Sequence, residues 1–143
     1  MSESQTFKVS TTVEIPQARV QDLLVGALEG GSNYWYMIDR YILAEGIEKQ
    51  DFSAGGKLTD PESYYHPTQI IPFHPGCALV IGDIEGDEGF EAKNLDLENI
   101  QKGLQVMANK YPAAFAAFIA ENDDADTSDT FLQCCLFGEC VFG

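Results

Sequence analysis

Basic residues, histidines and long apolar runs are all scarce in this sequence. Eight lysines and arginines stand against 23 acids in 143 residues, which gives a formal net charge of -15. This excess of negative charge argues against direct binding of nucleic acid, which depends on neutralising phosphates. No apolar run approaches the roughly 18 residues that a membrane span needs, and the N-terminus MSESQTFK lacks a signal-peptide pattern. We therefore expect a cytoplasmic protein that does not contact a membrane.

Motifs for catalysis and cofactor binding are also missing. The sequence contains no nucleophile elbow, Walker loop, dinucleotide fingerprint or HExxH, so we expect no cofactor. The glycine pair at 30–31 follows the C-terminal end of a predicted helix, where the dipole disfavours a phosphate. No two cysteines form a CxxC pair, and we expect all of them to stay reduced, with the vicinal pair buried on a helix: Cys77, Cys134, Cys135 and Cys140.

Metal binding is the next possibility that the residue pattern disfavours. His66, His74, Cys77 and Asp83 are zinc-ligand types, but their spacing matches no zinc signature. We interpret both histidines as proline-flanked loop residues that form hydrogen bonds. A calcium loop counted from Asp83 fails as well, because Glu88 stands where such a loop needs glycine. We expect no metal site.

The most strongly patterned part of the chain lies between residues 16 and 43. Apolar residues recur at helical spacing from Val20 to Leu28, which predicts a helix over 16–29 with one face in the core. Pro16 suits its first turn, and a glycine at 30 or 31 can end it. The aromatic run that follows predicts a strand from Tyr34 to about Leu43.

Two segments carry a resemblance to a known family: ALEGGSNYWY near the N-terminus and KYPAAFAAFIAENDDADTSDTFLQCCLFGECVFG at the C-terminus. Together they resemble a family of uncharacterised small acidic proteins that bacteriophages and prophages encode. The resemblance covers both ends of the chain and little of its middle. It implies a phage origin and action in a bacterial host cell, and it implies no particular chemistry.

The remaining elements complete an α+β prediction. Alternation over 7–15 and an apolar run over 77–84 predict two further strands, and 139–142 could add another. Helices are expected from Asp96 to about 110, over 112–121 after a break at Pro112, and over 127–137. We expect a small, mainly antiparallel sheet of about three or four strands, covered by the N-terminal helix and the C-terminal helices.

The domain organisation follows from length and composition. A chain of this size with 45% hydrophobic residues fits one domain, 1–143. Residues 45–76 are rich in glycine and proline and form a long loop, with short strands at 57–59 and 68–73 and the length of a lid. The C-terminal helices carry more large apolar surface than one small sheet buries, which favours a homo-oligomer.

Candidate ligand-binding residues surround the aromatic run. Glu29 ends a helix, where an acid is electrostatically unfavourable, so we expect it to be solvated, or paired with Arg19 or Arg40 in a specific role. On a strand, Trp35 would point away from both flanking tyrosines. One aromatic face would then pack in the core while the other could stack on a base or a partner. The ligand-binding prediction comprises Glu29, Asn33, Tyr34, Trp35, Tyr36, Arg40 and His66.

The acids gather in two stretches, 83–98 and 121–129, which hold 7 + 5 = 12 of the 23. Solubility alone explains such charge, and docking on a basic host protein is the sharper alternative. Asp126 and Asp129 have the spacing of an N-cap and an N3 acid for the last helix. The partner-binding prediction comprises Asp83, Glu85, Asp87 and Glu88.

Three classes of function remain open. The first is a non-enzymatic binding protein of phage origin that docks on a host protein or encloses a small molecule, such as a nucleotide signal of bacterial defence. The second is an acidic mimic of DNA, which requires two rows of carboxylates on one face. The third is a small hydrolase that uses carboxylates with His66 or His74 as general acid and base.

Overall fold

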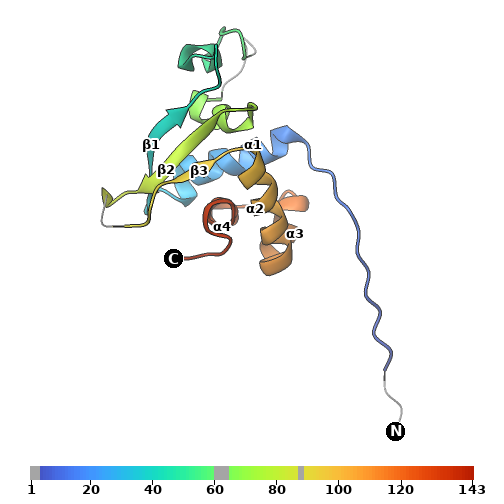
Figure 1. Ribbon diagram of the computed structural model, residues 1–143. Helices are drawn as coiled ribbons and strands as arrows, with labels where there is room; N and C mark the ends of the chain where they lie inside the picture. The colour runs from blue at the N-terminus through green and yellow to red at the C-terminus, as the bar shows by residue number, and fades with distance from the viewer. Residues whose placement is uncertain (1–3, 60–64, 87–88) are drawn as a thin grey trace.

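The computed structural model describes residues 4–59, 65–86 and 89–143. Its centre is a three-stranded antiparallel sheet with strand order β1-β2-β3 (Figure 1). The strands are β1 (Tyr36–Ile42), β2 (Ala78–Asp83) and β3 (Lys93–Leu95). Leu79 of β2 pairs with Tyr41 on one side and Leu95 on the other, and the register of β1 shifts between Ile38 and Arg40.

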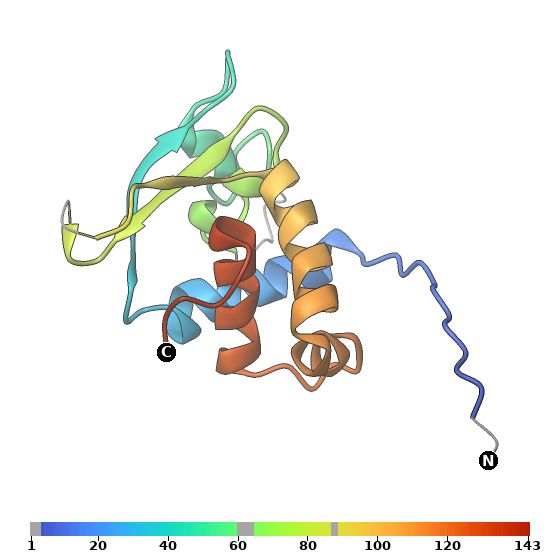
Figure 2. The ribbon, with the colours of Figure 1, turned by 60° about the horizontal axis from the view of Figure 1, so that its bottom comes forward.

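Helices pack on one face of this sheet, as Figure 2 shows for the N-terminal helix and the helices from the C-terminal half. The first is α1 (Gln17–Gly26), which continues into a π-helical turn over Ala27–Gly31. Its predicted apolar stripe from Val20 to Leu28 is buried, with exposed fractions of 0–6%. The α+β class with an N-terminal helix and C-terminal helices against an antiparallel sheet is therefore confirmed.

Three helices follow the sheet: α2 (Leu97–Lys110), α3 (Pro112–Ile119) and α4 (Ala125–Phe137). The predicted break at Pro112 is confirmed, because this proline occupies the first position of α3. Asp96 caps α2, as predicted, by accepting from Asn99 N at 2.9 Å. The cap predicted for α4 is wrong: Asp124 accepts from Thr127 N, so the helix begins earlier.

The strand predicted over 7–15 is wrong. These residues form an extended arm that leaves the body of the molecule and pairs with no described strand (Figure 1). The predicted strand over 139–142 is also wrong: after Gly138, whose φ is 72°, the chain folds back against α4 without joining the sheet. The third strand of the sheet is formed by residues 93–95, which were not predicted to be a strand.

The 45–76 region contains no strand among its described residues. Short 3-10 helices occupy Lys49–Phe52, Pro67–Gln69 and Ile71–Phe73. The strands predicted over 57–59 and 68–73 are wrong, because turns occupy the first range and two of these helices the second. Phe52 and Ile71 are fully buried, so both described parts of the region are attached to the core, and residues 60–64 of the expected lid lie outside the described residues. Among the helices of the described chain, none combines the length and apolarity required to cross a membrane.

Candidate functional site

A buried carboxylate joins the aromatic turn after α1 to the last helix. Asp129, in α4, is 8% exposed and accepts four side-chain hydrogen bonds. Its Oδ1 accepts from Ser32 Oγ and Trp35 Nε1, both at 2.7 Å. Its Oδ2 accepts from the Tyr34 hydroxyl at 2.6 Å and from Gln133 Nε2 at 3.0 Å. All four donors are uncharged, so dipoles rather than a salt bridge stabilise this carboxylate.

Gln133 extends the network to the C-terminal segment. Its Oε1 accepts from the backbone N–H of Val141 at 2.7 Å and of Phe142 at 2.9 Å. The Phe142 ring stacks on Trp35 with centroids 5.1 Å apart and planes at 7°. The segment around Trp35 and the C-terminal segment therefore meet in one network centred on Asp129.

Three glycines permit the close approach that the network needs. A Cβ on Gly31 would lie 2.3 Å from the Ala125 carbonyl oxygen, and one on Gly26 would lie 2.3 Å from Ser128 Oγ. A Cβ on Gly103 of α2 would lie 2.3 Å from the sulfur of Cys135. The backbones of α1 and α2 therefore contact α4 at positions where any side chain would collide.

Tyr34 marks the edge of this network. Desolvation and the hydrogen bond to the Asp129 carboxylate raise the pKa of Tyr34 from 10.0 to about 12, since ionisation would place two anions in contact. Burial, with a smaller contribution from Glu29, likewise raises the pKa of Tyr36, whose hydroxyl donates to the Leu28 carbonyl at 2.5 Å. Both hydroxyls act as neutral donors in the folded protein.

The structure disperses the seven residues predicted to bind a ligand. Trp35 is 2% exposed and packs in the core, so its ring does not form an exposed stacking surface. Glu29 is exposed, and its predicted arginine partners are wrong: it accepts from Gln69 Nε2 at 2.9 Å. Arg40 pairs with its neighbour Asp39. None of these residues lines a pocket that we describe: Glu29, Asn33, Tyr34, Trp35, Tyr36, Arg40 and His66.

His66 has a structural role of its own. Its Nδ1 accepts from Thr68 N at 3.2 Å and so caps the 3-10 helix that follows, while its backbone N–H donates to Gln69 Oε1 at 2.9 Å. Gln69 is 3% exposed and contacts Glu29 with the other end of its amide. Gln69 therefore contacts both Glu29 and His66. These contacts attach the 67–69 turn to the end of the first helix.

The other histidine lies in a small pocket of about 300 Å³ between β2 and the start of α2. His74 Nδ1 is 3.8 Å from the sulfur of Cys77 and 3.0 Å from the Pro75 carbonyl. The only acids that line this pocket are Asp96, which caps α2, and Glu98, which pairs with Lys102. Among the described residues, no group of three or more histidines, cysteines and acids has the geometry to hold a metal ion.

A second kind of site lies at the outer end of the sheet. A groove of about 410 Å³ runs between β1, the end of β2 and the segment that leads to β3. Asp83, predicted as a partner-binding residue, lines this groove, and Glu85 follows it with an exposed side chain. Asp87 and Glu88 of the same prediction lie outside the described residues. The described lining is Met37, Asp39, Gly82, Asp83, Gly86, Gly89, Phe90, Glu91 and Ala92.

Glycines keep this groove open. A Cβ on Gly82 would be in ordinary van der Waals contact with Met37 and Asp39, at 3.7 and 3.8 Å, so the floor has room for a methyl group. A Cβ on Gly89 would lie 2.0 Å from Asp83 Oδ2, so the turn can approach that carboxylate only through a glycine. Asp83 Oδ1 accepts from Glu85 N at 2.8 Å, which orients the side chain. Sequence analysis placed Glu91 in the acidic stretch 83–98 but missed Asp39 in this site, because β1 is brought beside the end of β2 only by non-local sheet pairing.

The second acidic stretch is used within the fold. Asp123 and Glu121 pair with Arg19 at 3.1 and 3.8 Å, and Asp124 caps α4. Asp129 is the buried acceptor of the network. Four of the five acids in 121–129 therefore have partners inside the chain, although only Asp129 of the five is buried.

Comparison with known proteins adds nothing to this geometry: no family model, curated protein or solved structure matches the chain.

Proposed function

We propose that this protein is a non-enzymatic binding protein that docks a basic segment of a host protein in the groove at the end of the sheet. The observation that carries the proposal is the lining of that groove, which combines three carboxylates, Asp39, Asp83 and Glu91, with the apolar side chains Met37 and Phe90. Asp39 also pairs with the exposed Arg40, which a partner's cation would replace. Lysine and arginine side chains combine a cationic head with an apolar stem, so they complement both parts of such a surface.

The groove is better suited to binding an extended peptide than to catalysing a reaction. Its described lining contains no histidine, cysteine, serine or lysine, so any catalysis there would depend on carboxylates alone. Phe90 connects the groove to the core, because its ring lies 5.9 Å from Trp35 and 4.9 Å from Phe137. A rigid wall of this kind supports binding with little loss of conformational entropy.

The alternatives are supported less well by the contacts within the chain. A DNA mimic needs two rows of free carboxylates, and in the second stretch Arg19 pairs with two acids, Asp124 caps α4 and Asp129 is buried. Sequestration of a nucleotide would use Trp35 and Tyr36, whose polar atoms are already bonded to Asp129 and Leu28. A host protein as the partner agrees with the phage origin that the resemblance implies.

The proposal can be tested with labelled peptides in a fluorescence anisotropy titration. A lysine-rich peptide should bind, more weakly as salt is raised, while a glutamate-rich peptide and a panel of nucleotides should not. Replacing the groove acids together, as Asp39→Asn, Asp83→Asn and Glu91→Gln, should weaken peptide binding by about tenfold, which corresponds to three partly exposed charge pairs.

A matched control separates the groove from the general negative charge. Glu45→Gln, Asp126→Asn and Glu139→Gln remove the same charge from exposed positions outside the groove, and should leave affinity nearly unchanged. Gly82→Val should also weaken binding, because the valine side chain fills the floor of the groove. Valine favours a strand, so the sheet should keep its structure. Equal losses in both triple variants, or nucleotide binding without peptide binding, would contradict the proposal.

A further inference from the structure

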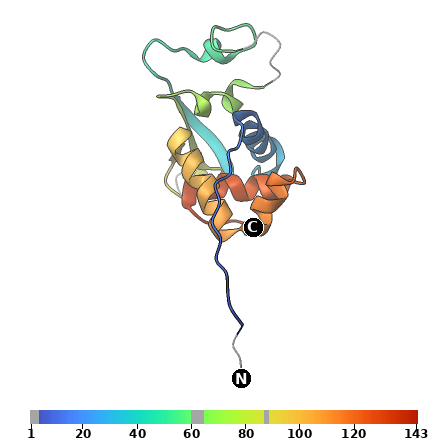
Figure 3. The same ribbon diagram turned by 90° about the vertical axis from the view of Figure 1, so that its right-hand side faces the viewer.

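The N-terminal arm has the pattern of a strand and no strand beside it. Phe7 and Val9 are 87% and 89% exposed, although both lie on the apolar side of a period-2 pattern that continues to Ile15. The backbone of residues 4–15 donates no hydrogen bond to another described residue and accepts none. Figure 3 shows the arm running away from the body. A segment of this kind requires a second strand and an apolar cover.

The edges of this protein's own sheet do not suit that role. The free edge of β1 carries a register shift between Ile38 and Arg40, next to the charged Asp39, and both features discourage strand addition. The edge strand β3 has three residues, and its Asn94 carbonyl accepts from Asn99 Nδ2 at 2.6 Å. An arm of nine residues needs a longer and more regular partner.

The arm itself meets this requirement. We propose that the arms of two copies pair antiparallel about a twofold axis at Thr11, so that the protein is a homodimer. In that register Lys8 lies opposite the partner's Glu14, and these are the only charged side chains between 7 and 15. The remaining opposed pairs are Phe7 with Ile15, Val9 with Val13, Ser10 with Thr12, and Thr11 with its own copy.

In other registers the opposed residues no longer match in both polarity and charge. A shift by one residue places the apolar face of one arm opposite the polar face of the other. A shift by two residues keeps the faces but moves Lys8 opposite Thr12 or Pro16, so that the charge pairing disappears. Pro16 has no N–H to donate, which ends the pairing at the point where the helix begins. The sequence of the arm therefore specifies one symmetric register.

A groove beside the arm supplies the apolar cover. It measures about 360 Å³ and lies between four residues of the arm and the side chains of α2 and α3, where Leu104, Ala108 and Phe115 are apolar and Gln101 and Gln105 are polar. The arm residues are Thr11, Thr12, Val13 and Ile15. Ile15 already packs against the core, and Val13 shares its face of the arm. Because the partner's Phe7 and Val9 lie opposite these two residues, they would enter this groove. One symmetric contact thus covers the exposed apolar residues of both arms.

Charge exchange tests the register. Lys8→Glu alone or Glu14→Lys alone places like charges opposite each other twice per dimer, and each should raise the dissociation constant of the dimer about tenfold in sedimentation equilibrium. The double variant Lys8→Glu with Glu14→Lys should restore the wild-type constant. A wild-type monomer at every concentration measured, or a double variant no tighter than the single ones, would overturn the proposal.

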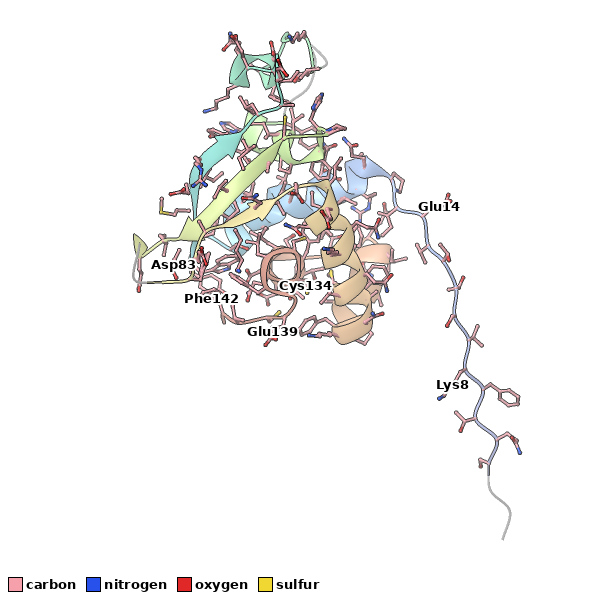
Figure 4. The ribbon with its side chains drawn as sticks, in the orientation of Figure 1. Lys8, Glu14, Asp83, Cys134, Glu139 and Phe142 are labelled. Carbon is pink, nitrogen blue, oxygen red and sulfur yellow. The ribbon has the colours of Figure 1, made fainter. Side chains whose placement is uncertain are left out.

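A cysteine scan tests the axis independently. Thr11→Cys faces its own copy at a Cβ separation of about 5 Å and should form an intersubunit disulfide under mild oxidation. Ser10→Cys is the control, since its copy is diagonal to it at about 7–8 Å. The arm lies at the opposite end of the molecule from Asp83 (Figure 4), so these variants leave the acidic groove unchanged. Equal crosslinking at both positions would contradict the twofold axis at Thr11.

Discussion

Two regions of this molecule are rich in acids and aromatic rings, and they are built in opposite ways. Around Asp129 the carboxylate accepts from four side chains, Trp35 stacks on Phe142, and glycines let α1 and α2 approach α4 closely. Around Asp83 the carboxylates face solvent, and Gly82 leaves the groove floor unfilled. The first arrangement stabilises a fold, while the second leaves charge and space available to a partner.

The comparison teaches that composition does not separate a binding site from a folding motif. Ser32, Tyr34 and Trp35 near an acid resemble a ligand site in the sequence, yet in the structure they satisfy the charge of Asp129. A buried carboxylate costs several kcal/mol unless it is fully hydrogen-bonded, so the donors are required by the acid itself. We expect the two regions to respond differently to substitution.

The largest effect is expected at the buried carboxylate. Asp129→Asn keeps the shape but replaces one acceptor oxygen by a donor, which then opposes the donors of Tyr34 and Gln133. Unfolding in urea should show a loss of about 3 kcal/mol, the cost of buried groups left without partners. Peptide affinity of the folded fraction should stay unchanged. A variant as stable as wild type would remove the structural role that we assign to this network.

Neighbouring glycines provide the next contrast. Gly31→Ala places a methyl group 2.3 Å from the Ala125 carbonyl and should cost about 2 kcal/mol through overpacking. Gly30→Ala meets no atom within 4 Å and should be neutral or stabilising by up to about 1 kcal/mol. Thermal unfolding of the two variants side by side measures the difference, and similar melting temperatures would mean that the close approach of α4 is not rigid.

At Gly89 we expect a smaller loss of stability than at Gly31 and a larger loss of peptide affinity than at Gly30. Gly89→Ala would bring a methyl group within 2.0 Å of Asp83 Oδ2, so the turn or the carboxylate must move. We expect a loss of about 1 kcal/mol in unfolding, at the low end of overpacking because the turn is exposed. Peptide affinity should fall more than it does in Gly30→Ala. If affinity is retained, the position of Asp83 does not matter for binding.

The smallest effect concerns alkaline pH. The pKa of Tyr34 is 10.0 in an unfolded chain and about 12 in the fold, so the folded state holds the proton more tightly. This contribution is fully present below pH 10 and is lost as pH rises through about 12. Tyr34→Phe should remove one late-titrating group from the tyrosinate absorbance curve and flatten the fall in stability over this range. An unchanged titration would contradict the contact with Asp129.

Local patterns allowed much of the fold to be predicted from the sequence. The stripe from Val20 to Leu28, the cap at Asp96 and the break at Pro112 are short-range signals, and the structure confirms each. The strand predicted over 7–15 is wrong, because alternating polarity indicates a strand but does not show that another strand lies beside it. The partner of Asp129 could not be predicted, because a contact across 94–97 residues leaves no periodic signal.

The candidate site was predicted only in part for the same reason. Asp83 and Glu91 belong to an acidic stretch that is visible in the sequence, whereas Asp39 joins them because β1 pairs with β2. Gly82 reads as a weak point in a strand and becomes the floor of a groove only when β1 lies beside it. Composition could therefore identify an acidic segment but could not identify the apolar side chains that give it shape.

Amide chemical-shift mapping tests the division between the two regions most directly. A lysine-rich peptide would be titrated into isotope-labelled protein while the backbone amide spectrum is followed. We predict that the perturbed amides lie in β1, at the end of β2 and over residues 89–92, and that those of Ser32, Trp35 and α4 stay unchanged. Shifts centred on residues 29–36 and α4, with none at the end of the sheet, would contradict the account.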